Sequence, residues 1–564
     1  MEKISNLGIM SNAFRAMAGL DSVYGYDIAV NENINALLKY GKFDRITYFY
    51  QPFQYQEAVI RRKYRSLKKR GNMNVELKLV SEMEVFNNNN KGKIDILHNV
   101  DMEFLPQLYY RETNPAHNMF PVTYMIHGAS YPYYLSDFFL KKLMAPFRPY
   151  DSLICTSNAV QKAVSNILET LQASLKSEYN QDFEYKGRLD ILPLGIDTDY
   201  FKPMDRKQSR MRYGIPMEVF VLLWIGRFSA YDKADLLPVF MAFRRLLVNN
   251  VDKEIKLIIA GYDRKSAPLL EIMNNYSKSL GIHEQVLFLE GHKLADRPYL
   301  YSCADIFISP VDNIQETFGL TPIEAMACGV PQVVSDWDGY KDSVVDNVTG
   351  YKIPTYWMKC DKDLIDNPML PSEPLIRSAL HHLLMSQSVA MDLDIFVKCV
   401  QGLIDNPLLL NKLKDNSVKR ARTIYEWKNL IPKYEDLWSE LKEISQEYGK
   451  SVDIKKKLLL FTPHYCDFFS EYPTRFIETH ECIRITIEGK ELLDGKLPIP
   501  KHYDVEDVLN STEIAVAILK ILKERESVSC DTLIKELNIY HEDKIKRSIM
   551  FVIKQGYAQL KKDI

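Results

Sequence analysis

Short apolar runs alternate with longer amphipathic runs along the first part of the chain, from Leu7 to Asp199. This alternation is typical of strand–helix–strand units that build a parallel sheet. The runs predicted to be strands are residues 46–50, 75–80, 94–97, 122–127, 153–156 and 189–192. The runs predicted to be helices are residues 31–38 and 158–171. We therefore expect a doubly wound α/β domain in this half.

The same alternation restarts after a polar bridge at residues 197–213. The strands predicted here are residues 219–225, 255–260, 286–289, 306–309 and 330–334. The predicted helices are residues 236–249, 267–280 and 322–327. Two alternating halves joined by a bridge indicate two doubly wound domains that face one another. In such sheets ligands bind outside the carboxyl ends of the strands, so the chemistry is expected in the loops there.

Beyond Trp438 the pattern changes. Residues 458–461 and 474–493 look rich in strands, with a hairpin expected at Glu488 and Gly489. Helices are then predicted at residues 512–525, 531–537 and 543–556, followed by a short apolar piece at 557–560. This order resembles a winged helix. Between Thr512 and Ile564 there are ten Lys and Arg against eight Asp and Glu, which is too few cations for a DNA-binding face and favours a protein partner or self-association.

The whole chain of 564 residues is longer than the usual ~100–150 residue domain, so several domains are expected. We place them at residues 1–200, 201–425 and 451–564, with a helix at 426–450 that crosses back to the first domain. Apolar residues make up 46% and charged residues 26%, as in globular proteins. The net charge of −2 makes nucleic acid an unlikely partner, because a protein that coats it would be far more basic.

Cellular location is predicted from three negative signals. Residues 1–10 show no signal-peptide pattern, and no run reaches the ~18 apolar residues of a spanning helix. None of the eight cysteines forms a Cys-x-x-Cys pair, which is typical of reduced thiols. We expect a cytoplasmic protein, with peripheral contact at the inner membrane surface as an alternative.

The most informative motif runs from Glu316 to Pro331. Thr321, Pro322 and Glu324 have the spacing of a capping box, which predicts a helix start directly after a turn at residues 318–320. A helix start next to a glycine presents free N–H groups and the positive end of the helix dipole, which is a site for phosphate. The alternative is that Glu324 only caps its own helix.

A second motif ends the predicted strand 219–225 with Gly226 and Arg227, and Lys233 follows in the next loop. The alternative reading is a solvated loop. A guanidinium and an ammonium at the carboxyl end of a central strand suit a diphosphate, because one offers a fork of donors and the other a point charge. Combined with the helix start after Gly319, the two cations favour an anion site.

Residues 192–351 resemble the donor-binding half of retaining GT-B glycosyltransferases, the group that includes glycogen and sucrose synthases. The resemblance rests on the segment 192–203, on Gly226, Arg227 and Lys233, on the pair Glu316 and Glu324 with seven residues between them, on the glycine-rich turn 339–350 and on the helix 425–438. It extends weakly over the first half, to about residues 1–441. It implies a GT-B fold in which residues 1–200 bind the acceptor and 201–425 bind the nucleotide sugar.

The resemblance also implies roles for these residues. Glu316 would bind hydroxyls of the donor sugar and Glu324 the ribose. The amides of Gly319, Leu320 and Thr321 would hold the distal phosphate, with Gly226, Arg227 and Lys233 as the diphosphate clamp. Arg227, Lys233, Glu316 and His127 are the expected catalytic residues, since the cations and amides stabilise charge that grows on the leaving group.

In the first half, His127 and Gly128 end a predicted strand. A histidine there is often structural, but the resemblance places it in the cleft beside the donor sugar. The acceptor-side loop keeps a single glycine, Gly19, followed by Asp21, which departs from the family pattern. Four Asp-x-Asp triplets are as frequent as chance supplies, so we expect no metal and no cofactor.

The predicted function is retaining transfer of a sugar from a nucleotide-diphosphate sugar to a hydroxyl of a glycan, a lipid-linked sugar or a protein. The alternatives are a non-catalytic GT-B scaffold that acts through residues 451–564, and a reversible synthase or phosphorylase. Two further segments were weighed as membrane or anion contacts. The basic run 61–70 holds seven cations, which would suit an anionic surface; the alternative is a solvated helix face. Residues 138–148 combine phenylalanine, leucine and basic residues, which would suit an interfacial helix; the alternative is core packing.

Overall fold

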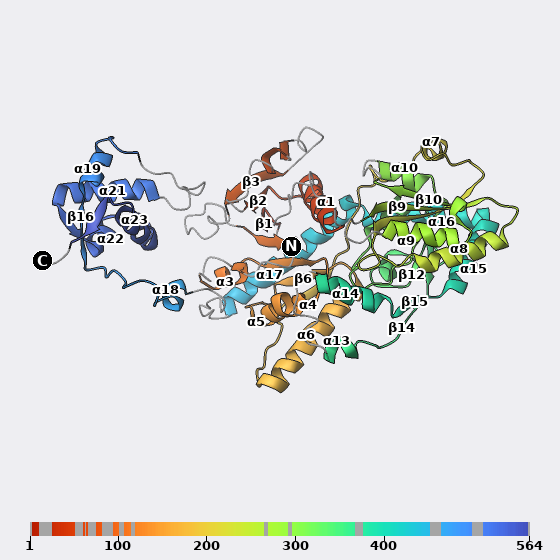
Figure 1. The fold of residues 1–564 in the computed structure, drawn as a ribbon, viewed down its shortest axis with the longest axis horizontal. Helices are drawn as coiled ribbons and strands as arrows, with labels where there is room; N and C mark the ends of the chain where they lie inside the picture. Colours follow the sequence, from red (N-terminus) through yellow and green to blue (C-terminus); the bar gives the residue numbers. More distant parts are fainter. Residues whose placement is uncertain are drawn as a thin grey trace. The chain divides into compact units, whose positions relative to one another are not determined.

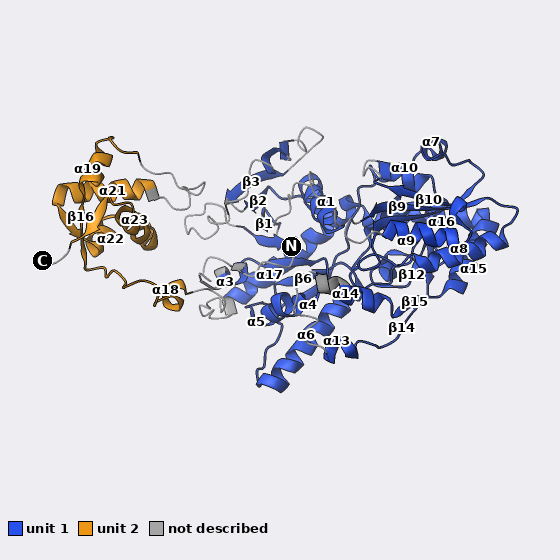
Figure 2. Ribbon diagram, in the orientation of Figure 1, with its two compact units in different colours: residues 1–50, 59–80, 88–458 blue, residues 51–58, 81–87, 459–564 orange. Residues whose placement is uncertain are grey.

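The protein is described here from a computed structural model. The structure describes residues 3–10, 25–50, 60–62, 64–65, 75–81, 94–100, 106–113, 119–263, 269–291, 296–366, 376–451, 464–498 and 511–561. Contacts divide the chain into two compact units, residues 1–50, 59–80 and 88–458 against 51–58, 81–87 and 459–564 (Figure 2). Within the described ranges, no helix combines the length and the apolar character needed to cross a membrane.

The first sheet of unit 1 is parallel, with the order β3-β2-β1-β4-β5-β6-β7 (Figure 1). Its strands are β1 (Asn6–Met10), β2 (Arg45–Tyr50), β3 (Glu76–Ser81), β4 (Ile96–Asn99), β5 (Val122–Ile126), β6 (Ser152–Cys155) and β7 (Arg188–Ile191). The helices named below are α1 (Gly25–Tyr40), α3 (Pro106–Thr113) and α6 (Asn158–Tyr179). The reversal of strand order next to β1 is that of a doubly wound fold, as predicted.

The second sheet repeats this topology with the order β10-β9-β8-β11-β12-β13. Its strands are β8 (Phe220–Phe228), β9 (Ile255–Asp263), β10 (Val286–Glu290), β11 (Ile306–Ser309), β12 (Gln332–Ser335) and β13 (Gly350–Ile353). The helices around it include α7 (Arg206–Arg212), α8 (Leu237–Asn249), α9 (Leu269–Ser279), α10 (Arg297–Ser302), α11 (Leu320–Ala327), α12 (Tyr340–Ser343), α15 (Leu393–Asp405) and α16 (Pro407–Arg420). Both predicted doubly wound sheets are confirmed. The predicted strand ends differ by at most three residues, because β8 and β9 pair for nine residues, further than their apolar runs.

Each face of the second sheet buries its own cluster of apolar side chains. Alternate residues of β8 point to opposite sides, so that Leu222 and Trp224 pack with α8 and α15 while Leu223 and Ile225 pack with α10 and α11. Strands covered on both faces are the reason why the sequence reads as continuous apolar runs rather than as alternation.

Helix α17 (Trp427–Ser451) follows the second sheet and packs on the first. Its residues Leu430, Tyr434 and Trp438 are fully buried in a cluster that also holds Leu7 and Ile9 of β1 and the underside of α11. The crossing helix expected from the sequence is therefore present. Its apolar face therefore joins the first sheet to α11, a helix that packs on the second sheet.

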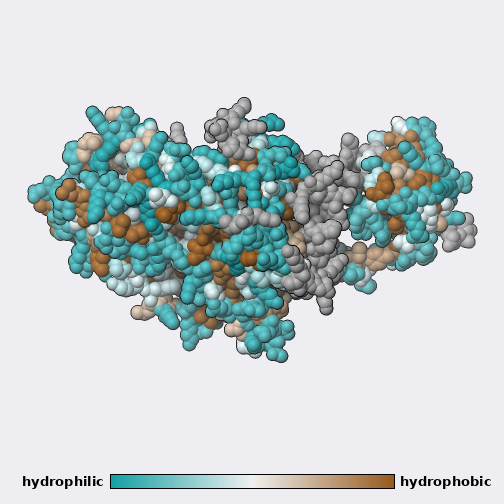
Figure 3. All heavy atoms as spheres, turned by 180° about the vertical axis from the view of Figure 1, so that it is seen from behind, coloured by the Kyte–Doolittle hydropathy of each residue, from teal (hydrophilic) through white to brown (hydrophobic). Residues whose placement is uncertain are grey.

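The expected interfacial helix at residues 138–148 is part of this unit's core instead. Phe138, Phe139, Leu143 and Phe147 are all buried. The alternative of core packing is the correct one, because these side chains lie against the first sheet rather than on the surface. The basic run 61–70 falls largely outside the described residues. On the face shown in Figure 3, hydrophobic residues of unit 1 are interspersed with hydrophilic ones.

Unit 2 is a small α+β module with an antiparallel sheet in the order β17-β16-β18. Its elements are α18 (Tyr465–Phe468), β16 (Cys482–Ile485), α19 (Ile487–Leu493), α21 (Ser511–Arg525), β17 (Ser527–Ser529), α22 (Cys530–Glu536), α23 (Glu542–Lys554) and β18 (Ala558–Leu560). The three predicted helices and the last strand are present, and the likeness to a winged helix stays a prediction. The first predicted strand, residues 458–461, lies outside the described residues.

The predicted hairpin at Glu488 and Gly489 is wrong, because both residues lie in α19. The hydroxyl of Thr486 accepts a hydrogen bond of 3.1 Å from the amide of Gly489 and so caps this helix. The alternation of Ile483, Ile485 and Ile487 imitates a longer strand, but Ile487 is 73% exposed.

Both sheets of unit 1 are fastened by a buried aspartate that immediately precedes a strand. Asp151, before β6, accepts two hydrogen bonds of 2.7 Å from Arg111 of α3 and one of 2.9 Å from the amide of Val122 in β5. Asp305, before β11, likewise accepts from Arg210 of α7 at 2.8 Å and from the amide of Val221 in β8 at 2.9 Å.

We expect Asp151→Asn to destabilise unit 1 by about 3–5 kcal/mol, because Arg111 would keep a buried charge without its counterion. The side chains of Arg111 and Asp151 are 1% and 0% exposed. The measurement is urea unfolding followed by tryptophan fluorescence. Asp44→Asn is the control, since its ion pair with Lys3 is solvent-exposed and should contribute nothing measurable. Equal effects of the two variants would contradict the prediction.

Candidate functional site

The predicted cations and the first predicted glutamate converge at the carboxyl edge of the second sheet. Lys233 lies in the loop after β8, and its Nζ donates a hydrogen bond of 2.8 Å to Oε2 of Glu316, which lies between β11 and α11. Burial is the largest single effect and would lower the pKa of Lys233 and raise that of Glu316. The charge of each partner and the hydrogen bonds of the pair together outweigh it, so the pKa of Lys233 is raised and that of Glu316 lowered. Both groups are therefore charged at neutral pH.

Arg227 stands at the end of β8, beside this pair. Its guanidinium lies 3.4 Å from the carboxylate of Asp232, and the two side chains are 15% and 9% exposed. Arg227, at the end of β8, and Lys233, in the loop that follows, thus lie close together, as expected from Gly226, Arg227 and Lys233. In this structure each cation has a carboxylate neighbour, which a more highly charged diphosphate could replace.

Asn313 holds the two sides of this site together, and the sequence analysis did not identify it. Its side-chain amide donates a hydrogen bond of 2.6 Å to the carbonyl of Lys233. Its side-chain oxygen accepts from the amides of Gln315 at 3.0 Å and Glu316 at 3.3 Å. Trp337 Nε1 donates to the Asn313 carbonyl at 2.7 Å. The sequence could have indicated Asn313 by its position, because it lies a few residues after β11. The backbone amides of a buried loop there need a side-chain acceptor.

Gly319 is required by the turn that leads into α11. Its φ is +85°, and a Cβ at this position would lie 2.0 Å from Cε1 of Tyr340. Gly319 is the N-cap of α11, and no side chain caps the helix. The first-turn amides of Leu320 and Thr321 therefore lack a side-chain cap among the described residues, as a phosphate site requires.

The predicted capping box is wrong. Helix α11 begins at Leu320 rather than at Pro322, and Thr321 lies inside its first turn. The carboxylate of Glu324 turns away from the helix start, since its Oε2 accepts hydrogen bonds from Arg297 and, at 2.6 Å, from the hydroxyl of Tyr301. A buried guanidinium is a stronger partner for a carboxylate than a backbone amide, which explains the change.

Glu324 is almost completely buried, with 4% of its side chain exposed. Burial raises its pKa, although Arg297 and Tyr301 act in the opposite direction. The structure therefore places the two glutamates in different surroundings. Glu316 lies with Lys233 at the strand edge, and Glu324 lies in a closed cluster behind α11. Its expected contact with a ribose stays a prediction.

His127 follows β5 and lies at the carboxyl edge of the first sheet. Its Nε2 donates a hydrogen bond of 2.8 Å to the carbonyl of Val100, and its ring meets the edge of Tyr26 with centroids 5.1 Å apart. Burial lowers the pKa of His127 to about 4, against the effect of the Val100 hydrogen bond, so the ring is neutral. Its carbonyl accepts a hydrogen bond of 3.3 Å from the hydroxyl of Thr317, the neighbour of Glu316.

The two strand edges meet at Thr317. Its carbonyl accepts hydrogen bonds from the hydroxyls of Thr156 at 3.2 Å and Ser157 at 2.9 Å, both after β6. Beside them, the carboxylate of Asp342 accepts from the amide of Asn158 at 2.6 Å, at the start of α6. The structure therefore brings the His127 loop and the Glu316 loop together, as the facing arrangement predicts.

Asp338 is a second residue that the sequence analysis passed over, as part of a chance Asp-x-Asp triplet. It has a φ of +34°, and it accepts a hydrogen bond from the amide of Gly339. A Cβ at Gly339 would lie 2.5 Å from Cα of Phe318, so this turn lies directly against the Glu316 loop. Burial, and then the charge of Glu316, raise the pKa of Asp338 well above its usual value.

Several buried polar atoms at this edge have no hydrogen-bond partner among the described residues. They are Ser130 Oγ, Ser229 Oγ, Asp312 Oδ1, Thr321 Oγ1 and Asp338 Oδ2. Buried polar atoms are almost always paired in proteins, so a group of exceptions indicates where a polar ligand is accommodated. Burial raises the pKa of Asp312 to about 8, which leaves a protonated carboxyl able to donate a hydrogen bond at neutral pH.

The structure does not test two of the expected site residues, nor the expectation that the site needs no metal or cofactor. Gly19 and Asp21 lie outside the described residues. Across the ranges that the structure describes, no three His, Cys, Asp or Glu side chains are grouped so that they could hold a metal ion. The expectation of a metal-free and cofactor-free site stays a prediction.

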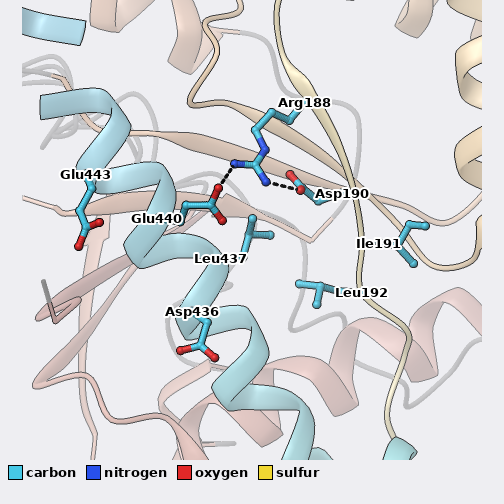
Figure 4. A pocket seen from close by; sticks show the side chains of 8 residues that line it. All are labelled: Arg188, Asp190, Ile191, Leu192, Asp436, Leu437, Glu440 and Glu443. Carbon is cyan, nitrogen blue, oxygen red and sulfur yellow. Dashed lines mark hydrogen bonds and ion pairs between the residues drawn. The ribbon is translucent and has the colours of Figure 1, made fainter. Parts of the chain in front are cut away.

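A separate hollow of about 320 Å³ lies between β7 and α17 (Figure 4). Its lining residues are Arg188, Asp190, Ile191, Leu192, Asp436, Leu437, Glu440 and Glu443. Arg188 donates hydrogen bonds of 2.6 Å to Glu440 and 2.7 Å to Asp190. The lining contains four carboxylates and one cation, so it does not suit a diphosphate, and it includes none of the predicted site residues.

The segment that contains these loops is similar to a known protein family. Residues 205–366 match the family model described as Glycosyl transferases group 1. This group 1 segment runs from α7 through α13 (Lys362–Asp366) and contains Arg227, Lys233, Glu316 and Glu324. The match covers the second sheet and not the first, so it bears on the predicted donor half alone.

Curated relatives and solved structures agree with this segment in part. The chain is 30% identical over 221 residues to D-inositol 3-phosphate glycosyltransferase 1 of Catenulispora acidiphila, covering 37% of this chain and 52% of that relative. It is 32% identical over 182 residues to D-inositol 3-phosphate glycosyltransferase of Mycobacteroides abscessus, covering 32% of this chain and 38% of that relative. The chain thus spans about half the length, or less, of these curated relatives.

Two solved structures are similar over a larger share of the chain. The sucrose-phosphate synthase from Thermosynechococcus elongatus is 15% identical, covering 78% of this chain and 100% of that one, with a TM-score of 0.47. Anabaena HepE, crystallised in complex with UDP, is 14% identical with the same coverage and a TM-score of 0.49.

We expect Gly319→Ala to destabilise the protein by more than the ~1–2 kcal/mol that a left-handed backbone costs an L residue, because the new Cβ also meets Tyr340. Gly281→Ala is the matched control, since Gly281 has a φ of +69° with nothing within 4 Å of its Cβ. Thermal unfolding of both variants measures the difference. A Gly319→Ala variant as stable as Gly281→Ala would contradict the turn geometry.

Proposed function

We propose that this protein is a retaining glycosyltransferase that transfers a sugar from a nucleotide-diphosphate sugar to an acceptor hydroxyl. The observation that carries the proposal is the convergence of Arg227, Lys233, Glu316 and the uncapped start of α11 at one strand edge, within the group 1 segment. These groups supply two cations, one carboxylate and free amides over a short distance. This set fits a diphosphate joined to a sugar.

In the proposed reaction the bond between the anomeric carbon and the diphosphate breaks, and negative charge grows on the leaving phosphate oxygen. Arg227, Lys233 and the amides at Gly319, Leu320 and Thr321 would stabilise that charge more strongly than the charge of the bound donor. Glu316, freed from Lys233 when the ammonium turns to the phosphate, would accept hydrogen bonds from the sugar hydroxyls. The charge on the diphosphate is thus met by the protein's own cations, so the proposal requires no metal.

Retention is proposed from the resemblance of residues 192–351 to retaining GT-B glycosyltransferases, and no carboxylate of the site is assigned here as a nucleophile. The leaving diphosphate would then take the proton of the incoming hydroxyl on the same face. The neutral ring of His127, on the opposing edge, would face the sugar rather than ionise. An inositol phosphate is one acceptor to test, since the curated relatives are named for it.

The proposal predicts that UDP-glucose, or another member of a nucleotide-sugar panel, raises the melting temperature of the chain. A ligand at about 100 times its dissociation constant stabilises the folded state by about 2.7 kcal/mol. Lys233→Ala should abolish the shift. Lys253→Ala is the control, because Lys253 forms an exposed ion pair with Asp405, and it should keep the shift. If no nucleotide or nucleotide sugar stabilises the wild-type chain, the proposal fails.

Glu316→Gln tests the carboxylate without a change of size. We expect turnover of the identified donor to fall by about 10–10²-fold, because the hydrogen bonds from the sugar hydroxyls would lose their charged acceptor. Nucleoside diphosphate release in a coupled assay measures it, and binding of the free nucleoside diphosphate should change little. Unchanged turnover would exclude Glu316 from the reaction.

A further inference from the structure

A long excursion of the chain between β13 and α15 brings a histidine to the site described above. The excursion consists of β14 (Thr355–Trp357), α13 (Lys362–Asp366), α14 (Ile376–Ser386) and β15 (Val389–Met391). Strands β14 and β15 pair antiparallel, so the chain leaves and re-enters the second sheet at the same place. The group 1 match ends at residue 366, before α14.

Helix α14 is fastened to the loop that carries Lys233. The hydroxyl of Ser386 donates a hydrogen bond of 3.4 Å to the carbonyl of Ala230, and Gln387 donates one of 3.3 Å to the carboxylate of Asp235. Both acceptors lie within a few residues of Lys233. The excursion is therefore part of the wall beside the proposed donor site.

His382 of α14 is buried against the first sheet's loop. It is 1% exposed, and its ring lies 4.8 Å, between centroids, from that of Tyr131. Neither ring nitrogen makes a hydrogen bond of normal geometry with a described residue, and the same holds for the hydroxyl of Ser130. Three buried polar atoms thus gather where the His127 loop meets α14, and such atoms need a partner.

The imidazole of His382 is expected to be neutral. Burial lowers the pKa of His382, against smaller opposite effects of the Ser130 backbone and the charge of Asp232. A neutral imidazole has one donor and one acceptor nitrogen, which suits a pair of neighbouring hydroxyls. A neutral imidazole also offers no positive charge to a phosphate, and the nearby guanidinium of Arg227 is already paired with Asp232.

Three tyrosines on the same loop add flat apolar faces. Tyr131 and Tyr134 lie 5.3 Å apart, and Tyr133 and Tyr134 lie 4.7 Å apart, between ring centroids. All three are partly exposed. The ring of Tyr134 lies over Gly128, next to His127, at 3.6 Å from the position of a Cβ. A sugar ring presents both hydroxyls and a face of C–H groups, so it matches this combination of polar atoms and rings.

We infer that Ser130, Tyr131 and His382 form the acceptor subsite, and that it receives an uncharged polyhydroxylated ring such as a sugar or an inositol. This inference rests on the proposed function, because it assigns the second substrate of the same site. It selects an uncharged ring over a phosphorylated one.

Saturation-transfer NMR with the full-length chain and UDP tests the subsite. The neutral probes are methyl α-D-glucopyranoside and myo-inositol, and the anionic counterparts are glucose 6-phosphate and inositol 3-phosphate. We expect a neutral probe to give saturation-transfer signals with the wild-type chain. Its apparent affinity should fall at least about tenfold in His382→Ala and in Ser130→Ala. His382→Gln, which keeps a donor and an acceptor, should recover part of the binding.

His381→Ala is the matched control, because His381 precedes His382 on the same helix and no ring contact with Tyr131 is recorded for it among the described residues. It should bind the neutral probe as the wild type does, and all variants should keep their stabilisation by UDP. If UDP binds but no neutral probe does, if only the phosphorylated probes bind, or if His381→Ala loses as much as His382→Ala, the inference is overturned. If UDP does not bind, the experiment is run with the nucleotide of the panel that stabilises the chain, and if none does, the proposed function fails first.

Discussion

The packing of α17 against the first sheet is the interaction on which the rest of unit 1 depends. The buried side chains of Leu430, Tyr434 and Trp438 lie in one cluster with β1 and with the inner face of α11. Without this cluster, the two sheets would be connected mainly by the polar segment 197–213, and their relative position would be poorly fixed. A shared core instead fixes the carboxyl edge of one sheet against that of the other, so that Thr317 can bond to residues of both loops after β5 and β6.

Each sheet is also braced in the same way at its opposite edge. Asp151 and Asp305 occupy equivalent places before a strand, and each binds an arginine and the first amides of the neighbouring strand. Rigid strand starts leave the conformational freedom at the other ends, in loops such as the one that carries Lys233. The strand starts are therefore rigid, and the loops at the carboxyl ends, where a ligand is proposed, can adapt.

The sequence predicted what is encoded in runs of neighbouring residues. Buried parallel strands such as β11 are continuous apolar segments, so they could be located. Arg227 ends β8, and Lys233 and Glu316 lie in the loops after β8 and β11, so these residues could be located as well. Asn313, Asp338 and His382 could not, because their importance lies in contacts between distant loops. The capping box at Thr321 and Glu324 failed for the same reason, since Arg297, far away in sequence, takes the carboxylate. Local alternation of isoleucines also misled at Ile487, where Thr486 starts a helix.

The closed cluster around Glu324 has a consequence for how such a protein can diversify. Glu324 holds α11 to α10 through Arg297 and Tyr301, so an exchange at this position would disturb the packing of the two helices. The excursion between β13 and α15 is less restrained away from His382, Ser386 and Gln387, because it leaves and returns through the paired strands β14 and β15. Changes of length and sequence can accumulate there while the machinery around Lys233 and Glu316 stays intact. Variation in this unit would then be concentrated in an appended segment rather than in its two sheets.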